Sequence, residues 1–217
     1  MKIETVLTAK ALWFVDLKNL NPRGRNLFRL ITPKLQEWFG FIPPTEFDEE
    51  KGVVFNGGEF SPSGTGNDMA GVSLTIYSNG AMATCRTSSS DAESFLEMIS
   101  ELLVNEGIIS YRTEMVTKKI YVSEVIARAG RVIVLPQLEP VYNALSNLLY
   151  AGNAQYSCTG LAFDIDPQLP VPHRHPPFRF ERSVNTKVEE NMWYSFAPLP
   201  TDEHVFVLEA IEEALAV

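Results

Sequence analysis

The sequence predicts an α+β protein built from two similar halves, each with the order strand, helix, three strands, helix. Three observations lead to this prediction: an alternating hairpin sequence over residues 72–87, amphipathic helical stripes, and recurrence of the same order about 111 residues later. Of the 217 residues, 45% are hydrophobic and 21% are charged. This composition is typical of globular proteins and excludes disordered, collagen-like and coiled-coil chains.

The first elements follow from apolar patterns and turn residues. Residues 10–17 predict a strand, and Asn21-Pro22 predicts the start of a helix with a buried stripe that includes Ile31 and Leu35. We expect Pro33 to kink or split this helix, because proline has no amide hydrogen to donate. Residues 53–60 predict the next strand, and the glycine-rich residues 61–67 predict a flexible connection.

Two alternating runs joined by Asn79-Gly80 predict a hairpin with a type I′ turn. The predicted register places Ser78 opposite Ala81 and Leu74 opposite Cys85 on the core side. Alternation then places the remaining side chains on the opposite, open face: Ser73, Thr75, Tyr77, Met82, Thr84 and Arg86.

Ser90 and Glu93 after the hairpin have the spacing of a capping box, with Ser90 as the predicted N-cap. The helix that follows should bury a stripe and end at Gly107. The members of the stripe are Phe95, Met98, Ile99, Leu102 and Leu103.

The second half is predicted without reference to the first. Residues 108–127 are expected to be extended, a helix is expected over 138–151, and strands are expected over 158–165, 178–184 and 192–197. A last helix should begin at Thr201. Two apolar stripes are expected to be buried, Val141, Leu145, Leu148 and Leu149 in the first of these helices and Val205, Phe206, Leu208, Ile211 and Leu215 in the last. Cys85 and Cys158 lie in predicted strands, which favours buried free thiols in a reducing cytoplasm.

The spacing predicts an internal duplication, with residues 1–110 and 111–217 as two halves of one continuous unit. Asp91 and Asp202 are 111 residues apart, and Ile99 and Ile211 are 112 apart. The net charge of −9 also divides along this repeat, since residues 1–44 and 111–160 are basic while residues 45–110 and 161–217 are acidic. A uniformly basic surface is excluded, but a local anionic partner is not.

The repeated order, with the Val72–Cys85 hairpin before a final amphipathic helix, resembles the duplicated fold of TATA-box-binding-protein-like proteins. It is also similar to a sporadically distributed bacterial family of about this length. The resemblance implies one curved antiparallel sheet with helices on its convex side. It does not imply TATA-box recognition, because the two hairpins lack the paired phenylalanines that wedge between base steps, and Glu181 and Asp164 fall on the exposed face.

The open sheet face is the first candidate binding surface. Applying the offset of 111 pairs Met82 with Trp193 and Thr84 with Ser195, and alternation adds Arg179. Tyrosine, tryptophan and arginine are enriched at interface hot spots and also stack on bases. The candidate binding residues are Tyr77, Arg86, Arg179, Trp193, Thr75 and Thr84. The alternative is an ordinary polar sheet face.

His173 and His175 are the weak candidates for a metal site, because alternate residues of an extended segment point the same way. A third ligand would come from His204, Asp164 or Asp166. The flanking prolines favour the alternative, a stiff exposed loop. No known catalytic or phosphate-binding motif is present.

These observations favour a non-enzymatic, cytoplasmic binding or adaptor protein of bacterial type that engages a protein partner through the open face. The first alternative is a nucleic-acid-binding protein that uses the same face, and the second is a metal-assisted enzyme at His173 and His175. No cofactor is expected. Residues 1–20 do not have the pattern of a signal peptide, no membrane span is predicted, and a homodimer stays open.

Overall fold

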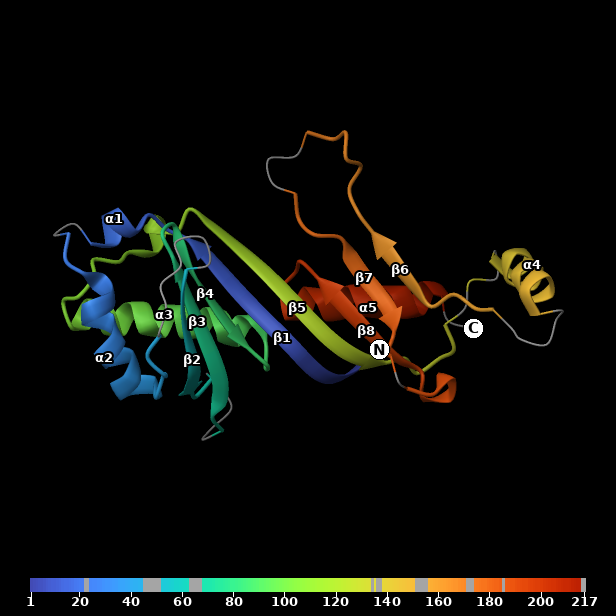
Figure 1. Cartoon of the computed structure of the whole chain (residues 1–217), viewed down its shortest axis with the longest axis horizontal. Helices are drawn as coiled ribbons and strands as arrows, with labels where there is room; N and C mark the ends of the chain where they lie inside the picture. Colours follow the sequence, from blue (N-terminus) through green and yellow to red (C-terminus); the bar gives the residue numbers. More distant parts are fainter. Residues whose placement is uncertain are drawn as a thin grey trace. The chain divides into compact units, whose positions relative to one another are not determined.

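The computed structural model describes residues 1–21, 24–44, 52–62, 68–133, 135, 138–150, 156–170, 174–184 and 186–215. Its first elements are β1 (Lys2–Phe14), α1 (Leu17–Leu20), α2 (Leu27–Phe39), β2 (Val53–Phe60), β3 (Ala70–Tyr77), β4 (Gly80–Cys85) and α3 (Ser89–Asn105). Then come η1 (Thr113–Met115), β5 (Lys118–Arg128), α4 (Glu139–Tyr150), β6 (Gly160–Phe163), β7 (Phe178–Arg182), η3 (Val188–Glu190), β8 (Met192–Ala197) and α5 (Thr201–Leu215). Figure 1 shows these elements along the chain.

The strands form one eight-stranded sheet in the order β2-β3-β4-β1-β5-β8-β7-β6. Strand β1 pairs antiparallel with β4, β3 with β2 and β4, and β7 with β6 and β8. The main helices and strands follow the same order in both halves. The predicted α+β class and the predicted antiparallel sheet are therefore confirmed.

The chain divides into two compact units. Unit 1 comprises Met1–Thr5, Glu124–Ala197 and Asp202–Val217, and unit 2 comprises Val6–Ser123 and Pro198–Thr201. Strands β1 and β5 each contribute residues to both units. The two units are described separately below.

The core of unit 2 lies between one face of its strands and the helices α2 and α3. Alternate residues of β1, including Ala9, Ala11 and Trp13, face this core, as period-two alternation requires. Phe95 of α3 packs edge-on against Phe39, with ring centroids 5.1 Å apart. Helix α2 is continuous through Pro33 and ends at Phe39, with Gly40 as its C-cap at a φ of 70°. The proline therefore does not split the helix.

The hairpin of β3 and β4 has a different register from the predicted one. Tyr77 pairs with Gly80 and Leu74 pairs with Ala83, so the turn residues are Ser78 and Asn79. Gly80 does not have a positive φ, and the predicted type I′ turn is therefore wrong. A side chain at Gly80 would collide with the backbone carbonyl oxygen of Trp13, so glycine is needed there for the close approach of β1. The error of two residues preserves the faces, because side chains alternate with period two.

The N-terminus of α3 also differs from the prediction. The N-cap is Ser88, whose side chain accepts a hydrogen bond from the amide of Asp91 at 3.0 Å, and Ser90 is exposed. Buried Ser89 exchanges two hydrogen bonds with Thr201, another unit 2 residue. The Ser89 amide donates to Thr201 Oγ1 at 2.9 Å, and the Thr201 amide donates to Ser89 Oγ at 2.8 Å. Glu93 binds Lys119 and Tyr121 instead of completing a capping box.

The core of unit 1 lies between alternate residues of β7 and β8 and the helix α5. Phe180 stacks on Trp193 with ring centroids 4.4 Å apart, and Arg182 lies 4.6 Å from the Trp193 ring centroid. Leu208 and Ile211 of α5 are buried as predicted, but Phe206 is 72% exposed and that part of the prediction is wrong.

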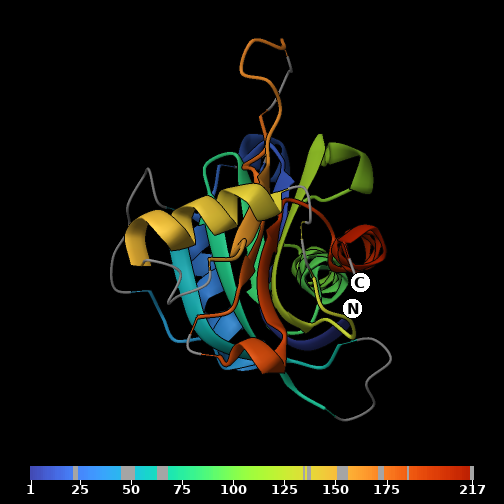
Figure 2. The same cartoon turned by 90° about the vertical axis from the view of Figure 1, so that its right-hand side faces the viewer.

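Helix α4 has nearly the predicted bounds but not the predicted burial. Its residues Val141, Leu145, Leu148 and Leu149 are exposed, and Leu148 reaches 82%. Figure 2 shows α4 (yellow) apart from α5 (red). Amphipathic spacing predicted the helix correctly, but spacing does not identify which surface, if any, covers the apolar stripe.

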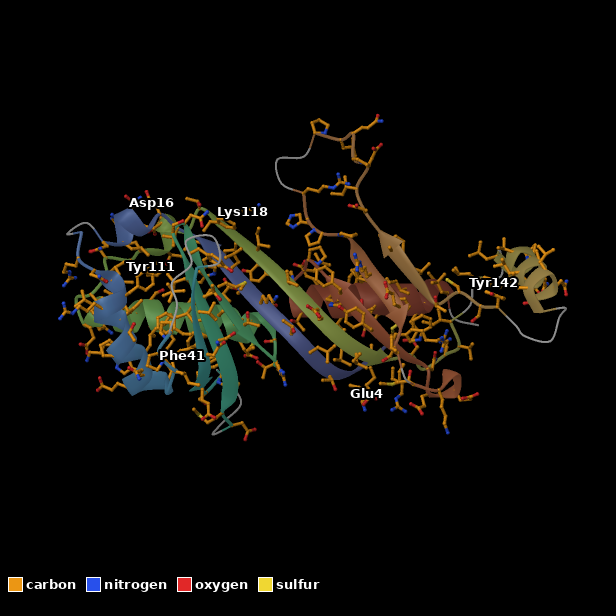
Figure 3. The ribbon with its side chains drawn as sticks, in the orientation of Figure 1. Glu4, Asp16, Phe41, Tyr111, Lys118 and Tyr142 are labelled. Atoms are coloured by element: carbon orange, nitrogen blue, oxygen red, sulfur yellow. The ribbon has the colours of Figure 1, made fainter. Side chains whose placement is uncertain are left out.

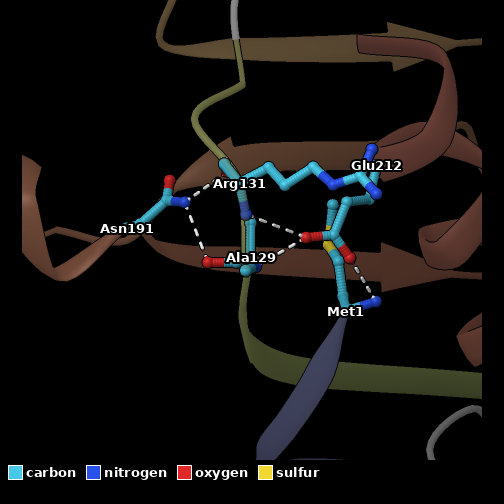
Figure 4. A network of polar contacts seen from close by, with 6 residues as sticks. Met1, Ala129, Arg131, Asn191 and Glu212 are labelled. Atoms are coloured by element: carbon cyan, nitrogen blue, oxygen red, sulfur yellow. Dashed lines mark hydrogen bonds and ion pairs between the residues drawn. The ribbon is translucent and has the colours of Figure 1, made fainter. Parts of the chain in front are cut away.

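A polar network in unit 1 connects α5 to the end of β5 (Figure 4). The Glu212 carboxylate accepts hydrogen bonds from the amides of Gly130 and Arg131 and pairs with the Met1 amine. Burial by itself would raise the pKa of Glu212. The two amide donors and the Met1 amine outweigh burial, so the pKa of Glu212 lies below its ordinary value. Asn191, with a φ of 52°, donates to the carbonyl oxygens of Ala129 and Arg131.

Three further predictions need correction. Strand β1 begins at Lys2, well before the predicted residue 10, and β5 occupies only the last part of the predicted extended segment 108–127. Cys85 and Cys158 are both free, and Cys85 is buried. Cys158 is half-buried and precedes β6, so its predicted place in a buried strand is wrong.

Candidate binding face

The face of the unit 2 strands opposite the core carries a mixed set of side chains, called here the open face. Cross-strand pairing arranges them in rows, because paired residues point to the same side of a sheet. One row contains Val54, Thr75, Met82 and Leu12, and the next contains Ser73, Thr84 and Lys10. Tyr77 and Phe14 flank Gly80 in a third row. The open face comprises Lys10, Leu12, Phe14, Val54, Ser73, Thr75, Tyr77, Met82 and Thr84.

These side chains are shielded by their strand neighbours but do not pack into the core. Leu12, Phe14 and Met82 are half-buried, and Val54 is exposed. None of them belongs to the core cluster of unit 2 or to the partly buried hydrophobic residues packed against it. Thr75 is the most enclosed member, at 7% exposure. Helices α2 and α3 therefore cover the other face of these strands.

The charges near the open face are mainly positive. Lys10 lies within the face, and Lys118 of β5 places its Nζ 6.0 Å from the Phe14 ring centroid. Figure 3 labels Lys118. Arg86 follows β4 and is exposed. Among the described pairs of β2, β3 and β4, one acidic residue points to this side. It is Glu59 of the edge strand β2, which pairs with Gly71 of β3. The face thus combines apolar, aromatic and hydroxyl groups with local positive charge.

Unit 1 has a corresponding face with a different character. Arg179 pairs with Phe196 and Glu181 pairs with Tyr194 across β7 and β8. The Tyr194 hydroxyl donates to Glu124 Oε2 at 3.2 Å. Burial raises the pKa of Tyr194, and the negative charge of Glu124 raises it further. This face contains both signs of charge and internal polar pairs.

The structure places some predicted binding residues where expected and not others. Tyr77 and Thr84 lie half-buried on the open face of unit 2, and Arg86 after β4 is exposed. Thr75 points to the same side but is buried at 7% exposure, so its predicted accessibility is wrong. Arg179 is exposed in unit 1. Trp193 is only 2% exposed and Ser195 is fully buried, so their predicted place on an open face is wrong.

This error has a simple cause in the repeat offset. An offset of 112 matches Ala83 to Ser195, Cys85 to Ala197 and Ser89 to Thr201, and every member of these pairs is buried. The offset of 111 used for Trp193 was one residue short, and in a strand one residue exchanges the two faces. The 112-residue spacing of Ile99 and Ile211 was the signal that could have placed Trp193 correctly.

The residues proposed as metal ligands are not brought together in the described parts. His173 lies outside the described residues, and His175 is exposed. Asp164 pairs with Arg174 at 3.2 Å, while His204 is fully buried. Across the ranges given above, no group of three or more His, Cys, Asp or Glu side chains has the arrangement of a metal site.

Sequence reasoning missed one pairing that resembles a catalytic dyad. His204 Nε2 lies 2.8 Å from Ser195 Oγ, and Ser195 Oγ donates to the carbonyl oxygen of Arg179 at the same distance. Burial lowers the pKa of His204 to about 4. A nucleophile must touch its substrate, and both side chains have zero exposure. The pair therefore acts as a satisfied polar contact within the core of unit 1.

No described helix combines the length and apolarity that crossing a membrane requires. No family model matches the chain, and no curated protein matches it. Among solved structures, the chain is similar to Methanococcus jannaschii TBP, with 15% sequence identity and a TM-score of 0.42. The similarity covers 99% of this chain and 96% of that chain.

Proposed function

We propose that this chain is a non-enzymatic binding protein that engages a protein partner through the open face of unit 2. The observation that carries the proposal is that Leu12, Phe14 and Met82 lie on a sheet face outside the core cluster. These three side chains are half-buried and adjoin the exposed Val54, and an apolar patch bordered by polar residues is typical of interaction surfaces.

The composition of the face supports a protein partner. Tyrosine, methionine and arginine are enriched at protein interfaces, and Tyr77, Met82 and Arg86 supply them here. Thr84 and Ser73 contribute hydroxyl groups that can both donate and accept hydrogen bonds. A sheet supports these side chains rigidly, which lowers the entropic cost of association.

A nucleic acid is the second candidate partner, and the charge distribution favours it. Three cationic residues lie on or beside the open face: Lys10, Lys118 and Arg86. Among the described strand pairs of this face, one residue is acidic, Glu59. Cationic groups neutralise phosphates, and the rings of Tyr77 and Phe14 offer surfaces for base stacking.

The test of the protein partner uses a photocrosslinking amino acid at Tyr77, with the same amino acid at Trp38 as the matched control. Trp38 is half-buried and packs with the helix-side core of the same unit. We expect a discrete crosslinked protein from position 77 only, and Met82→Glu should weaken its binding at least tenfold. Equal crosslinking from position 38, or unchanged affinity for Met82→Glu, contradicts the proposal. A product of twice the mass of this chain identifies a second copy as the partner.

A gel shift with single- and double-stranded DNA and RNA separates the two candidates. Nucleic-acid binding requires a shift at low salt that weakens steeply as salt rises, and Lys10→Glu should make the salt dependence shallower. The absence of a shift at low salt excludes the second candidate.

A further inference from the structure

Helix α4 carries an apolar stripe with the same spacing as the stripe of α2. An offset of 110 residues matches the two stripes position by position: Ile31 with Val141, Leu35 with Leu145, and Phe39 with Leu149. The three α2 residues are buried in the core of unit 2. The three α4 residues are exposed, at 52%, 37% and 61% in that order. The same pattern is therefore packed in one half and left open in the other.

The edge strand that follows α4 also leaves an apolar side chain uncovered. Phe163 of β6 pairs with Phe178 of β7, whose ring centroid lies 5.7 Å from that of His204 of α5. Paired residues point to the same side of a sheet, so Phe163 lies on the helix side of unit 1, where it is 54% exposed. In unit 2, α2 contacts the edge strand β2, and Phe55 of β2 is fully buried against Phe41, which follows α2. Unit 1 thus presents both an open helix stripe and an open sheet edge.

The connection before α4 is short and anchored, which restricts where α4 can lie in its own chain. The Glu212 carboxylate accepts a hydrogen bond from the Arg131 amide at 3.2 Å, and Ile133 is buried. Residues 134–138 then connect this anchored segment to α4, and five residues span at most about 17 Å. In unit 2, the twelve residues 15–26 lie between β1 and α2. Short connections favour the exchange of an element between two copies over closure within one.

We propose that two copies of this chain exchange α4, so that the α4 stripe of each copy packs on the helix side of β6 and β7 of the other. Each copy supplies one helix and one sheet edge, so the two equivalent contacts close into a twofold dimer. Burial of the two apolar surfaces drives the association. All of these elements belong to unit 1, so the dimer does not depend on the open face of unit 2. In a single chain at low concentration, the α4 stripe stays exposed.

Two variants that damage opposite sides of the contact test the exchange. Sedimentation equilibrium of the unmodified chain should show a monomer in equilibrium with a dimer of twice 24.3 kDa. Leu145→Glu in α4 and Phe163→Glu in β6 should each weaken dimerisation by about tenfold or more, because a buried carboxylate loses its hydration. Asn147→Glu is the matched control and should dimerise normally. Asn147 is exposed and matches Glu37 of α2, which is also exposed in unit 2.

Mixing the two damaged variants distinguishes exchange from other kinds of dimer. A mixed pair retains one intact contact, between α4 of the Phe163→Glu copy and β6 of the Leu145→Glu copy. Native mass spectrometry should therefore detect a mixed dimer that is tighter than the dimer of either variant alone. A dimer in which two α4 stripes pack against each other would tolerate Phe163→Glu and would gain nothing from mixing.

Circular dichroism checks that each variant is folded, and Leu149→Glu or Phe163→Ser replaces a variant that is not. Met82→Glu, on the open face of unit 2, should leave this dimer intact, so the test separates this proposal from the proposed function. A monomer at every concentration up to about 1 mM would overturn the exchange. So would a dimer that tolerates Phe163→Glu, a dimer lost in Met82→Glu or Asn147→Glu, or no gain on mixing.

Discussion

His204 makes the stability of unit 1 depend on pH. Its pKa is lowered to about 4 by burial, against an ordinary value of 6.5, so the folded state holds the neutral imidazole. An unfolded chain takes up this proton at higher pH than the folded one. The stability that the neutral His204 imidazole contributes to the folded state is therefore complete above about pH 6.5 and is lost as pH falls towards 4.

We expect this group to reduce the free energy of unfolding by about 3 kcal/mol between pH 6.5 and 4. Urea unfolding across this range should show a shallower pH dependence for His204→Gln than for the unmodified protein. His175→Gln is the matched control, because His175 is exposed. Identical pH dependence of the unmodified protein and His204→Gln would show that the imidazole does not carry this effect.

Single residues also show what sequence patterns can and cannot predict. The pattern identified the core side of β3 and β4 correctly, because alternation determines faces even when the register is wrong by two residues. It misplaced Trp193, because the face of a residue in one half was inferred from the other half with an offset one residue too short. An apolar pocket lined by residues such as Trp13 of β1, Ile31 of α2 and Leu96 of α3 could not be predicted, since it depends on how these elements pack together.

At the scale of elements, the reciprocal hydrogen bonds of Ser89 and Thr201 connect the starts of two helices. Each substitution that removes one hydroxyl leaves a buried amide without its acceptor, so Ser89→Ala and Thr201→Val should each cost about 1–3 kcal/mol of unfolding free energy. Ser90→Ala, at the neighbouring exposed position, should leave stability unchanged or slightly higher.

Thermal and chemical denaturation of the three variants measure these effects. Ser90 fits the capping pattern by sequence, but Ser88 occupies the cap position in the structure. A large loss of unfolding free energy for Ser90→Ala, together with no loss for Ser89→Ala, would indicate that Ser90 caps α3 as the sequence pattern predicts. That result would contradict the structure.

Helix α4 provides a second comparison between sequence and structure. Leu148 is 82% exposed although it belongs to an apolar stripe, whereas Leu96 of α3 is 2% exposed. We expect Leu148→Glu to change the unfolding free energy by less than about 0.5 kcal/mol, and Leu96→Ala to reduce it by about 2–5 kcal/mol. A comparable loss for both variants in urea denaturation would show that the α4 stripe is covered after all.

The bounds of β2 and β8 agree with the sequence prediction, and α5 starts at the predicted residue. Each of these elements combines a distinct apolar pattern with clear turn or cap residues at its boundary. Strand β1 was predicted too short because its first residues alternate weakly and contain charges. Their extended conformation depends on contacts with distant parts of the chain. For example, Arg128 of β5 pairs with Glu4 of β1 at 3.0 Å.

At the scale of the whole molecule, the net charge of −9 does not describe the proposed binding surface. Most of the charged groups described on or beside the open face of unit 2 are nevertheless cationic: Lys10, Lys118 and Arg86, against Glu59. A partner is therefore expected to meet apolar and cationic groups on one side of the sheet, while α2 and α3 occupy the other.

The most direct test of this account follows methionine methyl signals by NMR while the partner captured at Tyr77 is added. Met82 reports on the open face, and Met98 of α3 packs against the core on the helix side of the same unit. The account predicts that the Met82 methyl signal shifts or broadens at saturation while the Met98 signal stays unchanged. A change at Met98 with no change at Met82 would contradict the central claim that the open face is the binding surface.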